Sequence, residues 1–134
     1  MTEIKDLQEI AQDEDIEIMQ ADCPESGSVS LLFNGKCYIG IDEKTPEICK
    51  KERTAHELGH CIKGAFYNIY SPYDVISRHE ARADRWAIEE LIPNNELVEQ
   101  LKQNVDSIYA LAQYFEVSED FMKKACRYYG CYNG

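Results

Sequence analysis

The spacing of apolar residues divides the first third of the chain into one helix and three strands. Residues 2–12 place apolar side chains three or four positions apart, which is the spacing of one helical face. Residues 15–20 alternate acidic and apolar side chains and predict a short strand. Residues 28–33 and 36–41 also alternate, and they flank Asn34-Gly35, a dipeptide typical of a two-residue hairpin turn.

The alternation also predicts which strand residues share a face, because successive side chains in a strand point to opposite sides. One face of the first hairpin strand carries Val29, Leu31 and Phe33, and one face of the second carries Cys37, Ile39 and Ile41. We expect the three strands to form an antiparallel sheet. The strand 36–41 precedes the next helix by a short link, and we expect an exposed edge there that could pair with an extended peptide.

A long helix follows the hairpin. Thr45 is a good N-cap, Pro46 suits the first helical position, and Glu47 favours the positive end of the helix dipole. The pattern continues to about residue 65 and separates His56 and His60 from an apolar face. This apolar face consists of Ile48, Ala55, Leu58, Gly59 and Ile62, and the missing side chain of its glycine would permit close packing.

The rest of the chain reads as helices. An aromatic loop at residues 66–74 leads to a second long helix at 75–91, which Pro93 closes. Three shorter helices are predicted at 95–103, 107–115 and 119–129, separated by residues 104–106 and 116–118, with Gly130 as a C-cap. Because no repeat or linker divides the pattern, we expect a single α+β domain over residues 1–134.

The charge of the chain argues against nucleic acid as a direct partner. Acidic residues outnumber basic ones 25 to 14, for a net charge of −11, whereas a nucleic-acid binder needs a basic surface. The chain opens without a basic and apolar leader, and no run approaches the roughly 20 apolar residues of a membrane span. We therefore expect a cytoplasmic protein that does not act at a membrane.

The six cysteines are expected to be reduced thiols, several of them packed as small apolar residues. An even number would suggest disulfides in a secreted protein, but the absence of a signal sequence argues otherwise. No Cys-x-x-Cys pair is present, which also makes a second, cysteine-based zinc site an unfavoured alternative.

The run His56-Glu57-Leu58-Gly59-His60 has the spacing of a zinc site. Two histidines four positions apart on a helix lie on one face, so both can bind one Zn²⁺ ion. Glu57 is offset by one residue and can act as general base for a water that the zinc activates. The alternative is a pair of helix histidines that bind no metal.

A third ligand must come from another element, since a catalytic zinc keeps three protein ligands and one open position. Glu80 and Asp84 on the second long helix share a face, which suggests that Glu80 binds the metal and Asp84 accepts the free ring N–H of a ligand histidine. His79 is the alternative to Glu80 as third ligand. On an ideal helix its side chain points about 100° away from that of Glu80, so only one of the two can face the metal directly. The alternative role for Asp84 is a solvated ion pair with a neighbouring arginine, Arg82 or Arg85.

A peptidase also needs a donor for the scissile carbonyl. Five side chains near the second helix are within plausible reach, and their spacing singles out none of them: Tyr67, Tyr70, Tyr73, Arg78 and Arg82. The alternative for each tyrosine is simple packing of the loop.

These residues together resemble the ImmA/IrrE family of metallopeptidases. The resemblance rests on the histidine motif, on Glu80-Ala-Arg-Ala-Asp-Arg-Trp-Ala87, and on Leu91-Ile-Pro93, and it extends over roughly residues 28–130. Trp86 stands where the family usually has phenylalanine. The resemblance implies a small zincin-like domain in which His56, His60 and Glu80 bind one zinc ion and Glu57 is the base.

The resemblance also implies a substrate. Family members are commonly carried on prophages and are associated with site-specific cleavage of a repressor or another transcriptional regulator, so the expected partner is a regulatory protein. A second hypothesis is a zinc-stabilised module that sequesters such a regulator without cutting it, and a third is a purely structural zinc domain with a fourth protein ligand. Glu57 favours the enzyme, because a module that only binds has no need of a carboxylate at that position.

Overall fold

The computed structural model describes residues 1–68, 70–105 and 107–131, and the predicted segments 66–74 and 104–106 each contain one residue outside this part. The predicted end of the domain, residues 132–134, also lies outside it. The elements are, in chain order, α1 (Ile4–Asp13), β1 (Glu17–Gln20), β2 (Ser28–Phe33), β3 (Lys36–Ile41), α2 (Glu47–Lys63), α3 (Tyr73–Leu91), α4 (Asn94–Lys102), α5 (Ile108–Phe115) and α6 (Glu119–Tyr129). These elements confirm the predicted α+β class.

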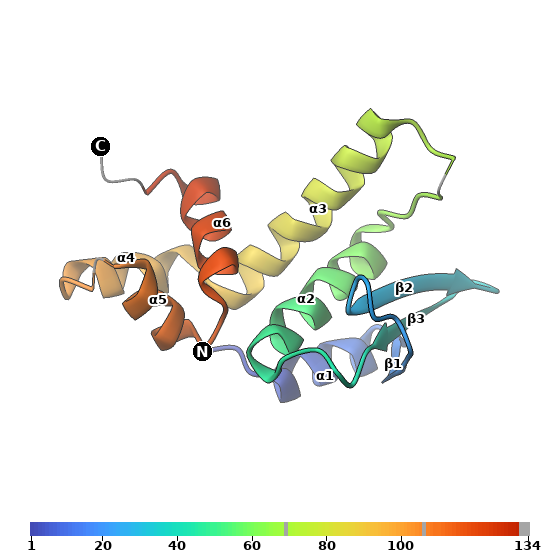
Figure 1. The fold of residues 1–134 in the computed structure, drawn as a ribbon, viewed down its shortest axis with the longest axis horizontal. Helices are drawn as coiled ribbons and strands as arrows, with labels where there is room; N and C mark the ends of the chain where they lie inside the picture. The colour runs from blue at the N-terminus through green and yellow to red at the C-terminus, as the bar shows by residue number, and fades with distance from the viewer. Residues whose placement is uncertain (69, 106, 132–134) are drawn as a thin grey trace.

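Helix α2 is the centre of the molecule. It packs against α3 on one side, against β2 and β3 on another, and against α1. Helices α4, α5 and α6 gather around the C-terminal end of α3, away from the sheet (Figure 1). This arrangement leaves the middle of α2 flanked by strand β2 and by α3, and both of these elements can supply side chains to the histidine motif.

The sheet is mixed rather than purely antiparallel. Its strand order is β1-β3-β2, with β1 parallel to β3 and β2 antiparallel to β3. Strand β3 is therefore central, and the expectation of an exposed edge at residues 36–41 is wrong. β2 pairs with one side of β3, and β1 pairs with the other. The sheet edge nearest the histidine motif is therefore the edge of β2.

Strand β2 turns its serines inward. Ser28 and Ser30 pair with Ile41 and Ile39, which share the face of β3 that packs toward α2. Val29, Leu31 and Phe33 do share a face, as predicted, but it is the solvent face, and they are 46%, 57% and 59% exposed. An apolar alternation usually marks the buried face; here the inward face carries Ser28 and Ser30, which border a cleft, followed by Leu32, which is exposed near the hairpin turn.

The first turn of α2 differs from the prediction. The N-cap is Pro46, and the Thr45 hydroxyl donates instead to the Gly27 carbonyl oxygen (3.1 Å), so the predicted capping role of Thr45 is wrong. Ile48 is exposed, contrary to its place on the predicted apolar face. Lys51 is buried in its stead, and its Nζ donates to the Phe115 carbonyl oxygen at the end of α5 (2.6 Å).

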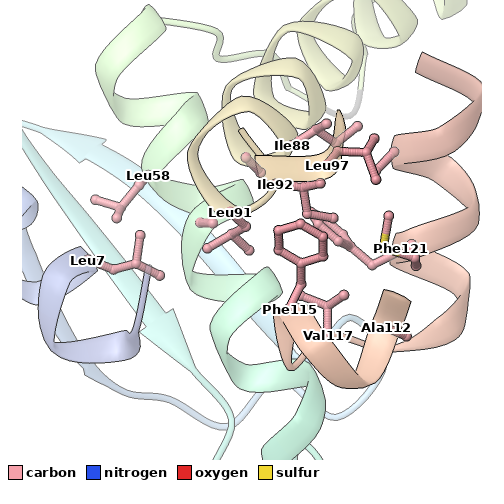
Figure 2. Packing of buried hydrophobic residues seen from close by; sticks show 14 of the residues in the cluster. Leu7, Leu58, Ile88, Leu91, Ile92, Leu97, Ala112, Phe115, Val117 and Phe121 are labelled. Carbon is pink, nitrogen blue, oxygen red and sulfur yellow. The ribbon is translucent and has the colours of Figure 1, made fainter. Parts of the chain in front are cut away.

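The hydrophobic core continues from the α1–α2 contact to the C-terminal helices. Leu7 faces Leu58 at one end, and Phe115 lies among Leu91, Ile92 and Phe121 at the other (Figure 2). Complete burial of such a side chain stabilises the fold by about 1.5–3 kcal/mol. The C-terminal helices thus pack around the end of α3. Helix α2 contacts the core both at the end formed with α1 and at the end formed by the C-terminal helices.

A disulfide joins Cys37 on β3 to Cys61 on α2, with Cα atoms 6.0 Å apart. The expectation that all six cysteines are reduced is therefore wrong for these two. Their sequence separation of 24 gave no sign that the strand and the helix bring them together. Among the described residues the free thiols are Cys23, Cys49, Cys126 and Cys131.

None of the described helices combines the length and the apolar character that crossing a membrane would require.

Candidate metal centre

His56 and His60 lie one turn apart on α2 and direct their Nε2 atoms to the same place. The two Nε2 atoms are 3.2 Å apart. Each Nδ1 is engaged on the other side: that of His56 donates to Asp84 Oδ1 (2.8 Å), and that of His60 to the Ala65 carbonyl oxygen (2.5 Å). Because Nδ1 of each ring is engaged in this way, Nε2 is the atom that either ring can present to a cation once its proton has left.

Helix α3 adds a carboxylate to the two imidazoles. Glu80 places Oε2 at 2.8 Å from His56 Nε2 and Oε1 at 3.3 Å from His60 Nε2. The ligand atoms of these three residues all lie within 4.8 Å of one another, and they are the one such group among the described residues. The sequence favoured Glu80 over His79 as the third ligand, and it is the Glu80 carboxylate that lies beside the two histidines.

This donor set suits a divalent transition metal. Two imidazole nitrogens and a carboxylate group converge, and among the described residues they hydrogen-bond to one another and to Tyr67. A cation bound there would replace the protons that now bridge them. Three protein ligands leave one position open, which is the arrangement of a catalytic rather than a structural zinc site.

The charges around the site are balanced by hydrogen bonds. Burial opposes protonation of His56, but its hydrogen bonds to Asp84 and Glu80 outweigh this effect and raise its pKa to about 9. Hydrogen bonds from His56 and His60 hold the pKa of the Glu80 carboxyl well below its ordinary value. Burial tends to raise the pKa of Asp84, but contacts with His56 and with Lys124, 3.3 Å away, lower it.

Asp84 lies between the His56 ring of α2 and Lys124 of α6. One oxygen accepts from His56, and the other faces Lys124 of α6. Neither Arg82 nor Arg85 forms an ion pair with it in the described part of the chain. Asp84 is therefore hydrogen-bonded to the His56 ring and is not paired with a neighbouring arginine in solvent.

Glu57 lies beside the His-His-Glu cluster and is held by a residue that the sequence did not indicate. Its side chain is buried, and Oε2 accepts a hydrogen bond from the Ser28 hydroxyl of β2 (2.6 Å). Oε1 accepts no hydrogen bond from the described residues, and it keeps some exposure to solvent. Glu57 is one of the residues that line the cleft. One carboxylate oxygen is thus anchored while the other is available to the cleft.

Tyr67 is the one of the five suggested carbonyl donors that reaches the site. Its hydroxyl donates to Glu80 Oε1, and this bond, with burial, raises the pKa of the phenol to about 12. Tyr70 and Tyr73 are more than four-fifths exposed. His79 packs its ring on that of Tyr67, with centroids 6.3 Å apart, and so supports the tyrosine instead of the metal.

Two clefts meet at the metal site. The first has a volume of about 340 Å³ and contains both histidines, Glu57, Tyr67 and the serines of β2. The second, of about 380 Å³, extends toward α6 and is bordered by Asp84 and Lys124. Arg53, His56 and Glu80 border both clefts. The sequence did not lead us to expect Arg53 at the site. Its position three residues before His56, on the same side of the helix, is the one feature of the sequence that could have indicated it.

A comparison with known protein families places the chain. The profile of the IrrE N-terminal-like domain (Peptidase_M78) matches residues 11–127, which includes the sheet, both long helices and nearly all of α6. No curated protein and no solved structure matches the chain. A match over most of the length, together with the His-His-Glu cluster, shows that the chain belongs to the IrrE N-terminal-like domain family of peptidases.

Proposed function

We propose that this chain is a zinc metalloendopeptidase that hydrolyses a peptide bond in a regulatory protein. His56, His60 and Glu80 hold the zinc ion, and Glu57 is the general base. The observation that carries the proposal is the convergence of three metal ligands beside a fourth, separately anchored carboxylate in one cleft. A site that only bound metal would need the three ligands but not the fourth group.

Zinc bound by these ligands would polarise a carbonyl group and lower the pKa of a water molecule at its open position. The residues of the chain do the rest. Glu57 takes a proton from the attacking water at its free oxygen and passes it to the leaving amine. Asp84 keeps His56 in the required tautomer. Tyr67, whose phenol stays protonated at neutral pH, donates to the oxygen of the scissile carbonyl.

The free edge of β2 supports binding of the substrate as an extended strand. In the described part of the chain no strand pairs with this edge, and Ser28, Val29 and Ser30 border the cleft that contains the proposed metal ligands. An extended peptide that adds to a sheet edge gains main-chain hydrogen bonds along its length. A peptide segment that is unstructured in the substrate fits this cleft better than one inside a folded domain.

The identity of the substrate as a transcriptional regulator rests on the family resemblance. We infer that this chain binds the regulator itself and does not contact DNA, because a net charge of −11 disfavours binding to nucleic acid. The same negative net charge would attract a substrate with a basic segment, which a DNA-binding regulator has.

The test compares the zinc-loaded wild-type chain with Glu57→Gln on two probes. The first probe is a library of proteome-derived peptides with blocked amines, in which mass spectrometry detects each new amino terminus. The second is a set of purified helix-turn-helix repressors. We expect cleavage by the wild type, none by Glu57→Gln, and one zinc ion per chain in both.

A different outcome would favour the sequestering module. If both proteins bound a repressor and released its DNA without forming a new amino terminus, the peptidase proposal would be wrong. Loss of zinc from Glu57→Gln would instead show that Glu57 is a ligand and not the base.

A further inference from the structure

We propose that Ser28 is a positioning residue for the general base: its hydroxyl holds the Glu57 carboxylate in the orientation needed for proton transfer. The inference rests on the role proposed above for Glu57. It also links the base on α2 directly to β2, the strand whose free edge borders the substrate cleft.

The hydrogen bond between the two side chains is short and shielded from water. Ser28 Oγ lies 2.6 Å from Glu57 Oε2, and the two residues are only 5% and 7% exposed. Hydrogen bonds from a hydroxyl to a carboxylate have this length and are about twice as strong as bonds between neutral groups. A buried carboxylate that lost its donor would be costly, so the pair has a strong preference for this geometry.

The backbone around Ser28 is fixed, which gives the hydroxyl a defined position. Ser28 pairs with Ile41 across the hairpin, and its carbonyl oxygen accepts from Ser26 Oγ (2.8 Å). The carbonyl oxygen of Gly27 accepts from the Asp42 amide (2.9 Å) and from the Thr45 hydroxyl (3.1 Å). The strand that carries Ser28 is thus attached to the segment that leads into α2.

Glu57 needs such a contact because its side chain has three rotatable bonds. Ser28 is the hydrogen-bond donor that the described part of the chain provides for it. Glu57 lines the cleft, and with Oε2 held its other oxygen does not have to find its position anew in each catalytic cycle. A displacement of about 1 Å in a reacting group can cost roughly 100-fold in rate.

The test separates positioning from a merely structural role. Ser28→Ala removes the donor, Ser28→Thr retains it, and Ser28→Cys supplies a weaker donor of similar size. Thr54→Ala is the matched control, because it removes another buried hydroxyl of this region that donates only to the backbone of α2, at the Lys50 carbonyl oxygen (2.8 Å). Zinc content and thermal unfolding are measured for every variant.

The kinetic readout uses a peptide that the wild type cleaves in the library. We expect Ser28→Ala to lower kcat by about 10- to 100-fold with KM within about twofold, because the base acts in the transition state and not in binding. Ser28→Thr should recover most of kcat, Ser28→Cys should be intermediate, and Thr54→Ala should match the wild type. If Ser28→Ala fails to fold, the other two variants test the inference, which requires a higher kcat for Ser28→Thr than for Ser28→Cys.

A second readout does not depend on turnover. A phosphinic peptide built on the cleaved sequence imitates the tetrahedral transition state, and its affinity is measured by calorimetry in a double-mutant cycle. We expect Ser28→Ala to weaken binding about tenfold in the wild-type background and to have no effect beside Glu57→Gln. An equal loss in both backgrounds would show a structural role and overturn the inference.

The remaining outcomes are also distinct. A zinc-loaded wild-type chain that cleaves neither the library nor any of the repressors overturns the proposed function, and this inference falls with it. An active wild type whose kcat is unchanged by Ser28→Ala overturns the inference alone.

Discussion

Gly59 of α2 and Ala83 of α3 are in backbone contact. A Cβ atom at position 59 would lie 2.6 Å from the Ala83 carbonyl oxygen and 2.9 Å from its Cα atom. Ala83 stands between Glu80 and Asp84, while Gly59 precedes His60. The close approach of the two helices at this point is therefore what brings the carboxylates of α3 within reach of the imidazoles of α2.

Gly59→Ala should destabilise the protein, although alanine normally stabilises a helix over glycine by about 1 kcal/mol. The new methyl group meets backbone atoms that cannot move aside, and such overpacking typically costs about 1–3 kcal/mol. Separation of the helices should also weaken zinc binding. Urea unfolding of the metal-free chain and zinc competition with a chromogenic chelator measure the two effects. A more stable variant with unchanged zinc affinity would refute this account of the contact.

Asp84→Asn should lower the zinc affinity by about 10- to 100-fold, the usual effect of losing a carboxylate that orients a ligand histidine. The amide keeps the size of the side chain but removes the charge that stabilises the His56 tautomer. Lys124→Gln is the matched control, since it removes the other partner of Asp84 without changing the bond to His56. Chelator competition on both variants should show a loss in the first alone; equal losses would assign the effect to the ion pair.

The sequence was sufficient wherever one local rule determined the geometry. Asn34-Gly35 forms the predicted hairpin because both residues adopt positive φ angles, 50° and 77°, as a two-residue turn demands. The pairs His56–His60 and Glu80–Asp84 share faces because the helical repeat requires it, so the metal cluster followed from spacing and family resemblance. Gly130 ends α6 with φ of 72°, as its C-cap role predicted.

The features that the sequence did not reveal depend on contacts between distant segments. β1 pairs with β3 in parallel, and nothing local to either strand specifies this. The two serines on the inner face of β2 depart from the rule that apolar residues face inward, and Ser28 hydrogen-bonds to Glu57 instead of packing in the core. Cys37 and Cys61 likewise meet only through the packing of β3 on α2.

Zinc affinity should rise with pH until about pH 9. In the metal-free chain the pKa of His56 is about 9, so at neutral pH a proton occupies the atom that zinc must bind. Zinc binding at pH 7 should therefore release protons, which calorimetry in two buffers of different ionisation enthalpy detects. An affinity that is constant from pH 6.5 to pH 9 would contradict the proton competition.

The stability of the metal-free chain should change in the opposite direction. The pKa of His56 in the folded chain lies above the unperturbed value of 6.5, so its stabilising effect is complete below pH 6.5 and is lost as the pH rises toward 9. Thermal unfolding with and without zinc across this range measures the effect. The zinc-loaded protein should lack this decline, because the metal replaces the proton.

Tyr67→Phe should lower kcat by about 100-fold while zinc remains bound, as expected for loss of one donor to the developing oxyanion. The aromatic ring, which packs against His79, is retained, so the fold should be unaffected. Tyr73→Phe is the control, because that side chain is 84% exposed and borders neither cleft at the metal site. Steady-state cleavage of the library-derived peptide and zinc analysis of each variant measure the outcome. If Tyr67→Phe loses zinc in parallel with activity, the hydroxyl supports Glu80 as a ligand instead of acting on the substrate.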